Sequence, residues 1–233
     1  VTGVQTCALP IFTFAGKHLR VENARLQQLP DPIPGIYFGG SSPAAGEVAA
    51  EHADVYLTWG EPPAAVAKKI AWIRELAEKR GRELTYGIRL HTITRDTSEE
   101  AWAEADRLLS GISDEDIRRV QEGLKRSESV GQQNMLALNG GSRDGLEIHP
   151  NLWAGVGLVR GGAGTSLVGS HEEVADLVEQ YAAVGVEEFV LSAYPHLEGA
   201  YHFGEGVLPL LEKRGLWTNP APITAQASVP FGA

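Results

Sequence analysis

The stretch Val55–Gly60 reads Val-Tyr-Leu-Thr-Trp-Gly, and Thr85–Ile93 reads Thr-Tyr-Gly-Ile-Arg-Leu-His-Thr-Ile. Short, mostly apolar runs of this kind are typical of strands that are buried on both faces of a sheet. Between them, Pro62-Pro63 suits the start of a helix and Gly81 suits its end. This helix carries one apolar stripe, formed by Val66, Ile70, Ile73 and Leu76. Two strands joined by a helix indicate a parallel sheet.

The strand–helix unit recurs along the chain. Further strands are expected at Gly35–Gly40 and Glu188–His196, and Pro43 begins a helix that runs to about His52. Two capping boxes mark further helix starts, Thr97-x-x-Glu100 and Ser170-x-x-Glu173. A last helix is expected over 199–213. Since a closed TIM barrel has eight such units in about 250 residues, we predict an α/β protein that contains only the C-terminal half of a TIM (β/α)8 barrel.

The segment 110–165 interrupts this rhythm. It is charged and rich in glycine, and we expect helices near 114–125 and 130–138. Insertions of this length between the strand–helix units of a barrel are usually functional lids or disordered segments. We therefore predict an insertion that acts as a mobile lid.

Residues 1–11 and 216–233 lie outside the pattern, which leaves 12–215 for the barrel half. Residues 1–11 resemble the translation of a sequencing-library adapter, so we expect an artefact joined to a truncated reading frame. A secretory signal would need a positive N-terminal region, which this segment lacks. The last segment is rich in Pro and Ala and is expected to be a tail.

The composition excludes several classes of function. The chain has 20 Lys and Arg against 30 Asp and Glu, a net charge of −10, which argues against nucleic-acid binding and attraction to anionic membranes. No apolar run approaches the ~18 residues that span a bilayer. A single cysteine excludes a disulfide framework, and the histidines lack metal-ligand spacing, so no metal is expected. P-loop, His-Glu-x-x-His and Gly-x-Ser-x-Gly motifs are absent.

Unusual side chains occupy the carboxyl ends of the expected strands, where TIM barrels place their active sites. Arg89 and His91 are two residues apart and therefore point to the same side of the third strand. Tyr194 and His196 repeat this spacing at the end of the fourth strand. Trp59 closes the second strand and is either core packing or the wall of a flat cofactor site.

Two arginines admit a structural and a functional interpretation. Arg89 lies in an apolar run, so it is either paired to a carboxylate inside the barrel or faces an anionic ligand. Arg160 is either a solvated loop charge or a mobile arginine that closes over an anion. The histidines and Tyr194 are either satisfied packing residues or members of the same site.

A glycine turn follows the first strand and leads into a helix. It reads Gly39-Gly40-Ser41-Ser42-Pro43. Backbone N–H groups at a helix start suit a phosphate group. Because glycine turns are common, this pattern indicates a phosphate site only in combination with other evidence.

With these residues in view, the chain from about Phe12 to Leu211 resembles the FMNH2-dependent alkanesulfonate monooxygenases of the bacterial luciferase-like superfamily. Six blocks carry the resemblance: Tyr37-Phe-Gly-Gly-Ser-Ser42, Tyr56-Leu-Thr-Trp-Gly-Glu-Pro-Pro63, Gly87-Ile-Arg-Leu-His91, Ser129-Val-Gly-Gln-Gln133, Pro150-Asn-Leu-Trp-Ala-Gly-Val-Gly-Leu-Val-Arg-Gly-Gly-Ala-Gly-Thr165 and Tyr194-Pro-His-Leu-Glu198. The resemblance implies a cytoplasmic TIM-barrel enzyme, usually a homotetramer. Such an enzyme takes reduced FMN from a separate NAD(P)H-dependent FMN reductase and, with O2, converts an alkanesulfonate to an aldehyde and sulfite for sulfur assimilation.

The resemblance also implies roles for single residues. Arg89, His91, Tyr194 and His196 correspond to catalytic positions, and Trp59, Arg89 and Arg160 to substrate-binding positions. Arg160 corresponds to the arginine of a loop that closes over the flavin. Gly40, Ser41 and Ser42 lie where the FMN phosphate is held. The family's N-terminal half is not in the sequence, so we expect the chain by itself to be inactive.

Three other functions are compatible with a barrel of this type. A deazaflavin-dependent oxidoreductase of the same superfamily is the nearest alternative. A catalytically silent flavin-binding protein is the second. An aldolase or isomerase that binds a phosphate is the third, and it would need a lysine or carboxylate base at a strand end.

Overall fold

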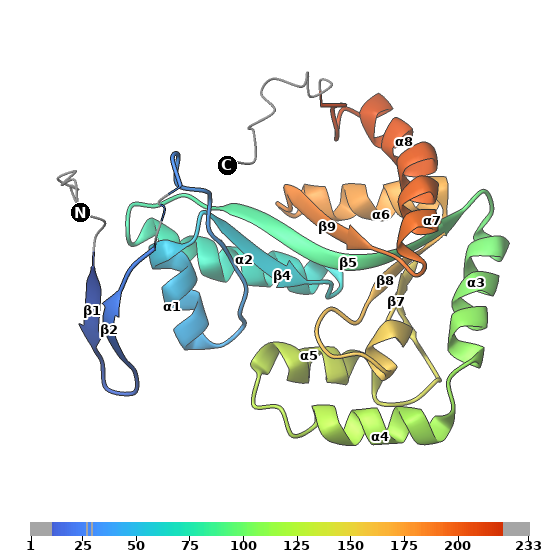
Figure 1. Cartoon of the computed structure of the whole chain (residues 1–233). Helices are drawn as coiled ribbons and strands as arrows, with labels where there is room; N and C mark the ends of the chain where they lie inside the picture. Colours follow the sequence, from blue (N-terminus) through green and yellow to red (C-terminus); the bar gives the residue numbers. More distant parts are fainter. Residues whose placement is uncertain (1–10, 27, 29, 221–233) are drawn as a thin grey trace, which may run out of the picture. The chain divides into compact units, whose positions relative to one another are not determined.

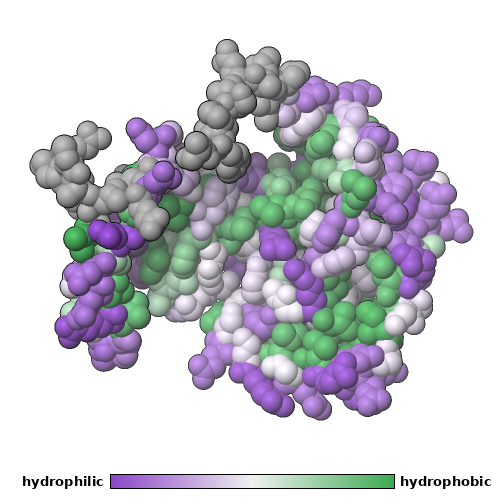
Figure 2. All heavy atoms as spheres, viewed as in Figure 1, coloured by the Kyte–Doolittle hydropathy of each residue, from purple (hydrophilic) through white to green (hydrophobic). Residues whose placement is uncertain are grey.

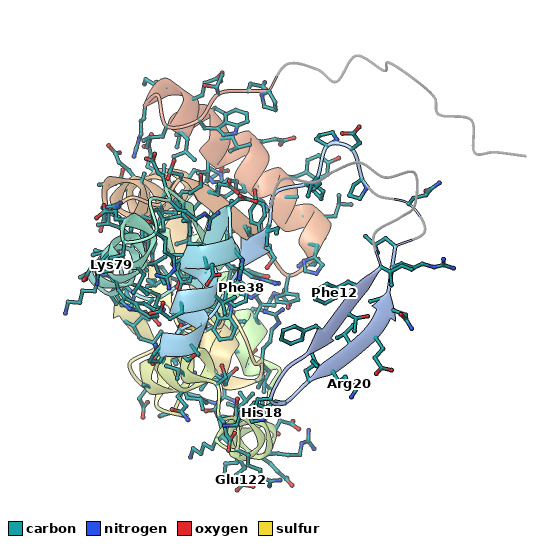
Figure 3. All side chains as sticks on the ribbon, turned by 90° about the vertical axis from the view of Figure 1, so that its left-hand side faces the viewer. Phe12, His18, Arg20, Phe38, Lys79 and Glu122 are labelled. Atoms are coloured by element: carbon teal, nitrogen blue, oxygen red, sulfur yellow. The ribbon has the colours of Figure 1, made fainter. Side chains whose placement is uncertain are left out.

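A computed structural model of the chain describes residues 11–26, 28 and 30–220, and Figure 1 shows its ribbon. The chain consists of two compact units, Val1–Ile36 and Tyr37–Ala233. The first unit contains an antiparallel pair, β1 (Phe12–Ala15) and β2 (Arg20–Ala24). Figure 3 labels a residue on each strand, and the ring of Phe12 stacks on Phe14 at 6.2 Å.

Four parallel strands form the centre of the second unit, as the sequence predicts. They are β3 (Tyr37–Phe38), β4 (Val55–Trp59), β5 (Thr85–Arg95) and β9 (Glu188–Ser192), in the spatial order β3-β4-β5-β9. Tyr37 Oη on β3 donates a hydrogen bond of 2.6 Å to the carboxylate of Glu188 on β9, although two strands lie between them. This link across one face shows that the sheet is curled, as in a partial TIM barrel. The predicted α/β fold class is confirmed.

Strand β5 is the longest strand and pairs with three others. Residues 85–89 pair with β4, 87–91 with β9 and 91–95 with β8 (Ser166–Ser170). Because His91 pairs with β9 and β8 at the same time, these two strands lie on opposite edges. Strand β8 therefore continues along the edge that β4 occupies in the first half of β5, as Figure 1 shows.

Helices cover the outer face of the curled sheet. Three of them bury small and apolar side chains against it: α1 (Pro43–His52), α2 (Pro63–Glu78) and α6 (His171–Ala183). The buried residues of this core include Ile88 and Leu90 of β5 and, from the three helices, Ala49, Val66, Ile70, Ile73, Leu177 and Tyr181. Gly81 and Gly185 have φ values of +66° and +101° and follow α2 and α6, the left-handed conformation that favours glycine at a helix end.

The remaining helices follow their sequence signals. Helix α3 (Ser98–Ser110) begins at the predicted capping box of Thr97, and α6 begins at that of Ser170. The last helical segment is continuous in the chain and consists of α7 (His196–Tyr201), η2 (His202–Val207) and α8 (Leu208–Lys213). Among the described residues, none of these helices combines the length and hydropathy that a bilayer span requires.

The insertion is folded rather than structureless. It contains α4 (Asp114–Leu124), α5 (Val130–Asn139), β6 (Glu147–His149), β7 (Leu152–Trp153) and η1 (Gly155–Leu158). The two helices match the sequence prediction. Strands β6, β7 and β8 were not expected. Strand β7 pairs antiparallel with β6 and with β8, and β8, which follows the insertion, joins the main sheet by pairing parallel to β5.

The fourth strand ends earlier than the sequence predicts. It was expected to reach His196, but β9 ends at Ser192. Tyr194 lies in the connection that follows, and His196 is the first residue of α7. Pro195 has no N–H and cannot continue a strand ladder, which accounts for the earlier end.

Two predictions concern the ends of the chain. The adapter assignment falls almost wholly on residues 1–10, and most of the predicted tail falls on 221–233. Both ranges lie outside the described residues.

A buried ion pair joins β4 to the helix behind it. Lys69 Nζ lies 2.8 Å from Glu61 Oε1, and their side chains are only 10% and 9% exposed. Lys69 also donates to Thr58 Oγ1 at 3.1 Å, and the amide of Asn134 on α5 donates to Glu61 at 3.1 Å. The pair thus fixes the insertion to the carboxyl end of β4.

We predict that Lys69→Met destabilises the second unit by about 3 kcal/mol, because Glu61 then keeps a buried charge without its partner. Urea unfolding followed by circular dichroism measures the change. The matched control is Lys79→Met, which removes an ion pair with Glu75 on the solvent side of α2, where Figure 3 labels Lys79. The control should leave the midpoint almost unchanged, and equal effects of the two substitutions would contradict the assignment.

Candidate active site

The face of the sheet opposite the core carries the residues singled out in the sequence. Side chains alternate along a strand, so Arg89 and His91 point away from the core residues Ile88 and Leu90. Arg89 is paired in register with Trp59 on β4 and with Val190 on β9, which places all three on this concave face. Of the strand residues predicted for the site, Trp59, Arg89 and His91 are therefore brought together.

Arg89 is a partly buried cation on this face. Its Nε atom is buried and has no hydrogen-bond partner among the described residues. Within the described part of the chain, no carboxylate lies within 4.0 Å of its guanidinium nitrogens, since the ion pairs of this part involve other basic residues. The structural alternative, an ion pair inside the barrel, is not present there. A partly desolvated guanidinium in this position is suited to bind an anion.

His91 lies at the centre of a polar cluster and is 2% exposed. Its Nδ1 lies 2.9 Å from Ser192 Oγ, and its Nε2 lies 3.0 Å from Arg160 Nη1 and 3.1 Å from the carbonyl oxygen of Ala163. A guanidinium only donates hydrogen bonds. Arg160 Nη1 also donates to the carbonyl oxygen of Ala163 at 3.2 Å, so Nε2 faces one group that only donates and one that only accepts.

The surroundings of His91 disfavour its charged form. Burial lowers the pKa of His91 to about 4 from its ordinary 6.5, and the positive charges of Arg160 and Arg89 act in the same direction. The imidazole is therefore neutral at neutral pH. Two permanent cations beside a neutral ring leave a net positive site on the concave face.

An aromatic column extends from His91 to α7. The ring of Tyr194 stacks on His91 with centroids 5.4 Å apart, and the ring of His196 lies 5.2 Å from Tyr194. The register of β9 explains the contact, because Ser192 pairs with His91 and the chain then turns over it. Although the strand ends early, Tyr194 and His196 both reach the predicted site.

Two glutamines of the insertion hold the loop that carries Arg160. Gln132 on α5 is buried and accepts a hydrogen bond of 2.9 Å from Gly162 N. Gln121 on α4 is also buried and donates to the carbonyl oxygens of residues 157 and 158. The position of Arg160 beside His91 thus depends on α4 and α5. Closure of this segment over a ligand remains a prediction.

A small cavity of about 160 Å³ lies at the carboxyl ends of β3 and β4. It is lined by Gly40, Ser41 and Trp59, together with Ser129 and Gly131 at the start of α5. Tyr56 Oη donates to the carbonyl oxygen of Gly40 at 2.7 Å and fixes the turn. Backbone N–H groups and two hydroxyls around a cavity of this size suit a phosphate group rather than a whole flavin.

Ser42 caps the helix that follows the glycine turn. Its Oγ accepts a hydrogen bond of 3.2 Å from Ala45 N at the start of α1, as Ser129 Oγ does from Gln132 N at the start of α5. A capping hydroxyl keeps its proton to donate, but Ser42 does not line the cavity, whereas Gly40 and Ser41 do. A role of Gly40, Ser41 and Ser42 in holding a phosphate stays a prediction.

Some residues of the site were not identified in the sequence. Ser192 ends an apolar strand and lies two residues before Tyr194, so the alternation of the strand could have indicated it. Ser129 and Gln132 lie in a block that resembles the family, but nothing in their local pattern indicates contact with the barrel. Among the described residues, no cluster of His, Cys, Asp or Glu is suited to hold a metal ion.

Comparisons with known proteins show the family and the fold of the chain. The model of a family described as "luciferase-like monooxygenase" matches residues 6–188. Among solved structures, a riboflavin lyase determined with modified FMN and riboflavin has a TM-score of 0.68 and 20% identity, covering 91% of this chain and 51% of its own. A long-chain alkane monooxygenase has a TM-score of 0.65 and 23% identity, covering 89% and 48%.

A third similar structure uses another cofactor according to its description. It is the coenzyme F420-dependent tetrahydromethanopterin reductase from Methanopyrus kandleri, with a TM-score of 0.54 and 16% identity, covering 85% of this chain and 57% of its own. At these identities the likeness concerns the fold. The chain spans about half the length of the solved structures that it matches.

The electrostatics of His91 give a measurable prediction. Because its folded pKa of about 4 lies below the ordinary 6.5, the unfolded chain takes up the proton first. The stability that the neutral ring contributes is complete above pH 6.5 and is lost as the pH falls toward 4. NMR of histidine-labelled protein should show His91 titrating near pH 4.

Replacement of Arg160 tests the cause of this shift. Arg160→Ala should raise the pKa of His91, because it removes a nearby positive charge. Arg126→Ala, which removes an exposed arginine of the insertion, is the matched control and should leave the titration of His91 unchanged. An unchanged titration of His91 in Arg160→Ala would show that Arg160 does not lie against the ring in solution.

Proposed function

The chain belongs to the luciferase-like monooxygenase family, and we propose that it forms part of the active site of a flavin-dependent monooxygenase that desulfonates alkanesulfonates. In the proposed reaction, an alkanesulfonate, O2 and reduced FMN give an aldehyde, sulfite, water and oxidised FMN. The C–S bond is broken, the carbon is oxidised to the aldehyde and O2 is reduced by the flavin electrons. One oxygen atom enters the aldehyde and the other leaves as water.

The observation that carries this proposal is the pair of guanidinium groups at His91. Arg160 contacts the ring directly, and Arg89 lies two residues along the same face without a carboxylate partner among the described residues. A sulfonate is a permanent anion, so its binding requires cations that do not lose their proton near neutral pH. Arginine meets this requirement better than lysine or histidine.

The residues at the cavity of Gly40 and Ser41 fit one part of FMN. Its phosphate would be held by the backbone N–H groups of this turn and by the hydroxyls of Ser41 and Ser129. Trp59, which lines the same cavity and faces Arg89, would lie against the rest of the cofactor. Reduced FMN, when bound, supplies the electrons that activate O2.

His91 is suited to accept a proton once an anion is bound. Its Nε2 lies 3.0 Å from Arg160 Nη1, where the anion would bind. An anion between Arg89 and Arg160 offsets the two charges that add to the effect of burial, so its binding raises the pKa of His91. Tyr194, stacked on the ring, excludes water from one face of His91 and links it to His196.

The proposed reaction requires partners. An NAD(P)H-dependent FMN reductase would supply the reduced flavin, and we propose a cytoplasmic homotetramer for the complete enzyme. Because the chain spans about half of the solved structures that it matches, turnover is proposed for an enzyme of that full length. Binding of the anion is proposed for the chain itself.

We predict that Arg89→Ala lowers the affinity of the chain for 1-octanesulfonate at least tenfold, measured by isothermal titration calorimetry. Removing one partner of a partly desolvated charged contact commonly costs this much or more. Arg126→Ala, which removes an exposed arginine of the insertion, is the matched control and should bind normally. Equal binding by Arg89→Ala and the unaltered chain would refute the assignment of Arg89.

The reaction itself is tested in a chain completed with four N-terminal βα units from the family. With reduced FMN and O2 it should release sulfite, and Arg89→Ala should abolish the release. Reduction of a deazaflavin by a substrate without O2 uptake would instead support the deazaflavin-dependent alternative. Tight FMN retention without substrate-dependent O2 uptake would support a silent flavin-binding protein.

A further inference from the structure

A second cavity, of about 310 Å³, opens between the end of α3 and the insertion. Its apolar lining comes from Leu108 and Ile112 on one side and from Trp153, Val156 and Val159 on the other. Figure 2 shows hydrophobic surface at the lower right, over the region where Figure 1 places β7 and the connection from α3 to α4. Nothing in the proposed desulfonation chemistry uses this cavity.

The cavity shares two residues with the site around His91. Its two polar lining residues are Arg160 and Tyr194. Arg160 Nη1 lies 3.0 Å from His91 Nε2, and the ring of Tyr194 stacks on His91. A ligand that contacts the guanidinium of Arg160 can therefore extend its apolar part into the cavity.

The floor of the cavity is fixed by the sheet that carries His91. Trp153 on β7 is 6% exposed and pairs with Ser166 on β8, and Ser166 pairs with His91 on β5. The ring of Trp153 also packs on Gly155, where an added Cβ would lie 1.9 Å from it. One wall of the cavity thus belongs to the same hydrogen-bonded sheet as His91. The cavity is therefore not merely a gap between loops.

The distribution of charge selects the kind of ligand. The apolar walls offer no counter-ion, whereas Arg160 at the rim is permanently cationic. This combination suits an amphiphilic anion with its head at the arginines and its tail along the walls. A cavity of about 310 Å³ is at the small end of ligand pockets, which favours a tail of modest length.

We propose that this cavity binds the apolar tail of the substrate and determines which chain lengths are accepted. The inference rests on the proposed function for the anionic head. It assigns Leu108, Ile112, Val156 and Val159 as specificity-determining residues. Each methylene that enters the cavity should improve affinity roughly fourfold.

The test is calorimetric titration of the chain with ethanesulfonate and 1-octanesulfonate. The longer sulfonate should bind at least tenfold tighter. Ile112→Trp, which fills the cavity from its partly exposed side, should remove most of this advantage and change ethanesulfonate binding less than twofold. Val48→Trp on the exposed side of α1 is the matched control and should keep the advantage.

A second variant acts in the opposite direction. Val159→Ala enlarges the cavity and should shift the optimum of a series of C2 to C12 sulfonates to longer chains. Circular dichroism shows whether each variant is folded, and misfolding of Ile112→Trp would leave Val159→Ala to decide. The inference is overturned if the two sulfonates bind equally, or if folded variants keep the original chain-length profile.

These outcomes separate the inference from the proposed function. Equal binding of both sulfonates that is lost in Arg89→Ala would overturn the tail pocket alone. Absence of binding by either sulfonate would overturn the proposed function and the inference together. Binding of 1-octanol as tight as that of 1-octanesulfonate would show an apolar pocket that does not recognise anions, and would overturn the inference as stated.

Discussion

The backbone pairing at His91 is the constraint on which the rest of the site depends. At this one residue, β5 pairs with β9 along one edge and with β8, the strand that directly follows the insertion, along the other. His91 N also donates to the carbonyl oxygen of Thr165 at 2.9 Å, which fixes where β8 begins. The end of the insertion therefore lies beside His91, the most buried histidine of the chain. This places Arg160, near that end, against the imidazole.

This arrangement explains how two cations can be held close to a histidine. The free energy that keeps Arg160 in place comes from its loop, which buried amides of Gln121 and Gln132 tie to α4 and α5. The same helices are fixed to β4 through Asn134 and the buried pair of Glu61 with Lys69. The fold of the insertion thus holds the two positive charges close together. A bound anion would reduce the repulsion between them.

Most of the fold could be predicted from the sequence because each signal acts over a few residues. Helix starts at Thr97 and Ser170 follow from capping boxes, and the buried strands follow from short apolar runs. Strand β8 was missed because Ser166–Ser170 is short and runs directly into the next helix without a turn residue between them. The end of β9 was misplaced because the apolar pattern continues past the point where the ladder stops.

The site could be predicted only in part for a related reason. Arg89 and His91 share one strand, so their common direction follows from alternation. The contact of Arg160 with His91 joins residues 69 positions apart and depends on how the insertion folds back, which no local pattern contains. A crystal structure of the chain with a short alkanesulfonate tests the central claim most directly. We expect a sulfonate oxygen within hydrogen-bond distance of the Arg89 guanidinium on the concave face, whereas an Arg89 paired to a carboxylate or turned away from a bound sulfonate would contradict the claim.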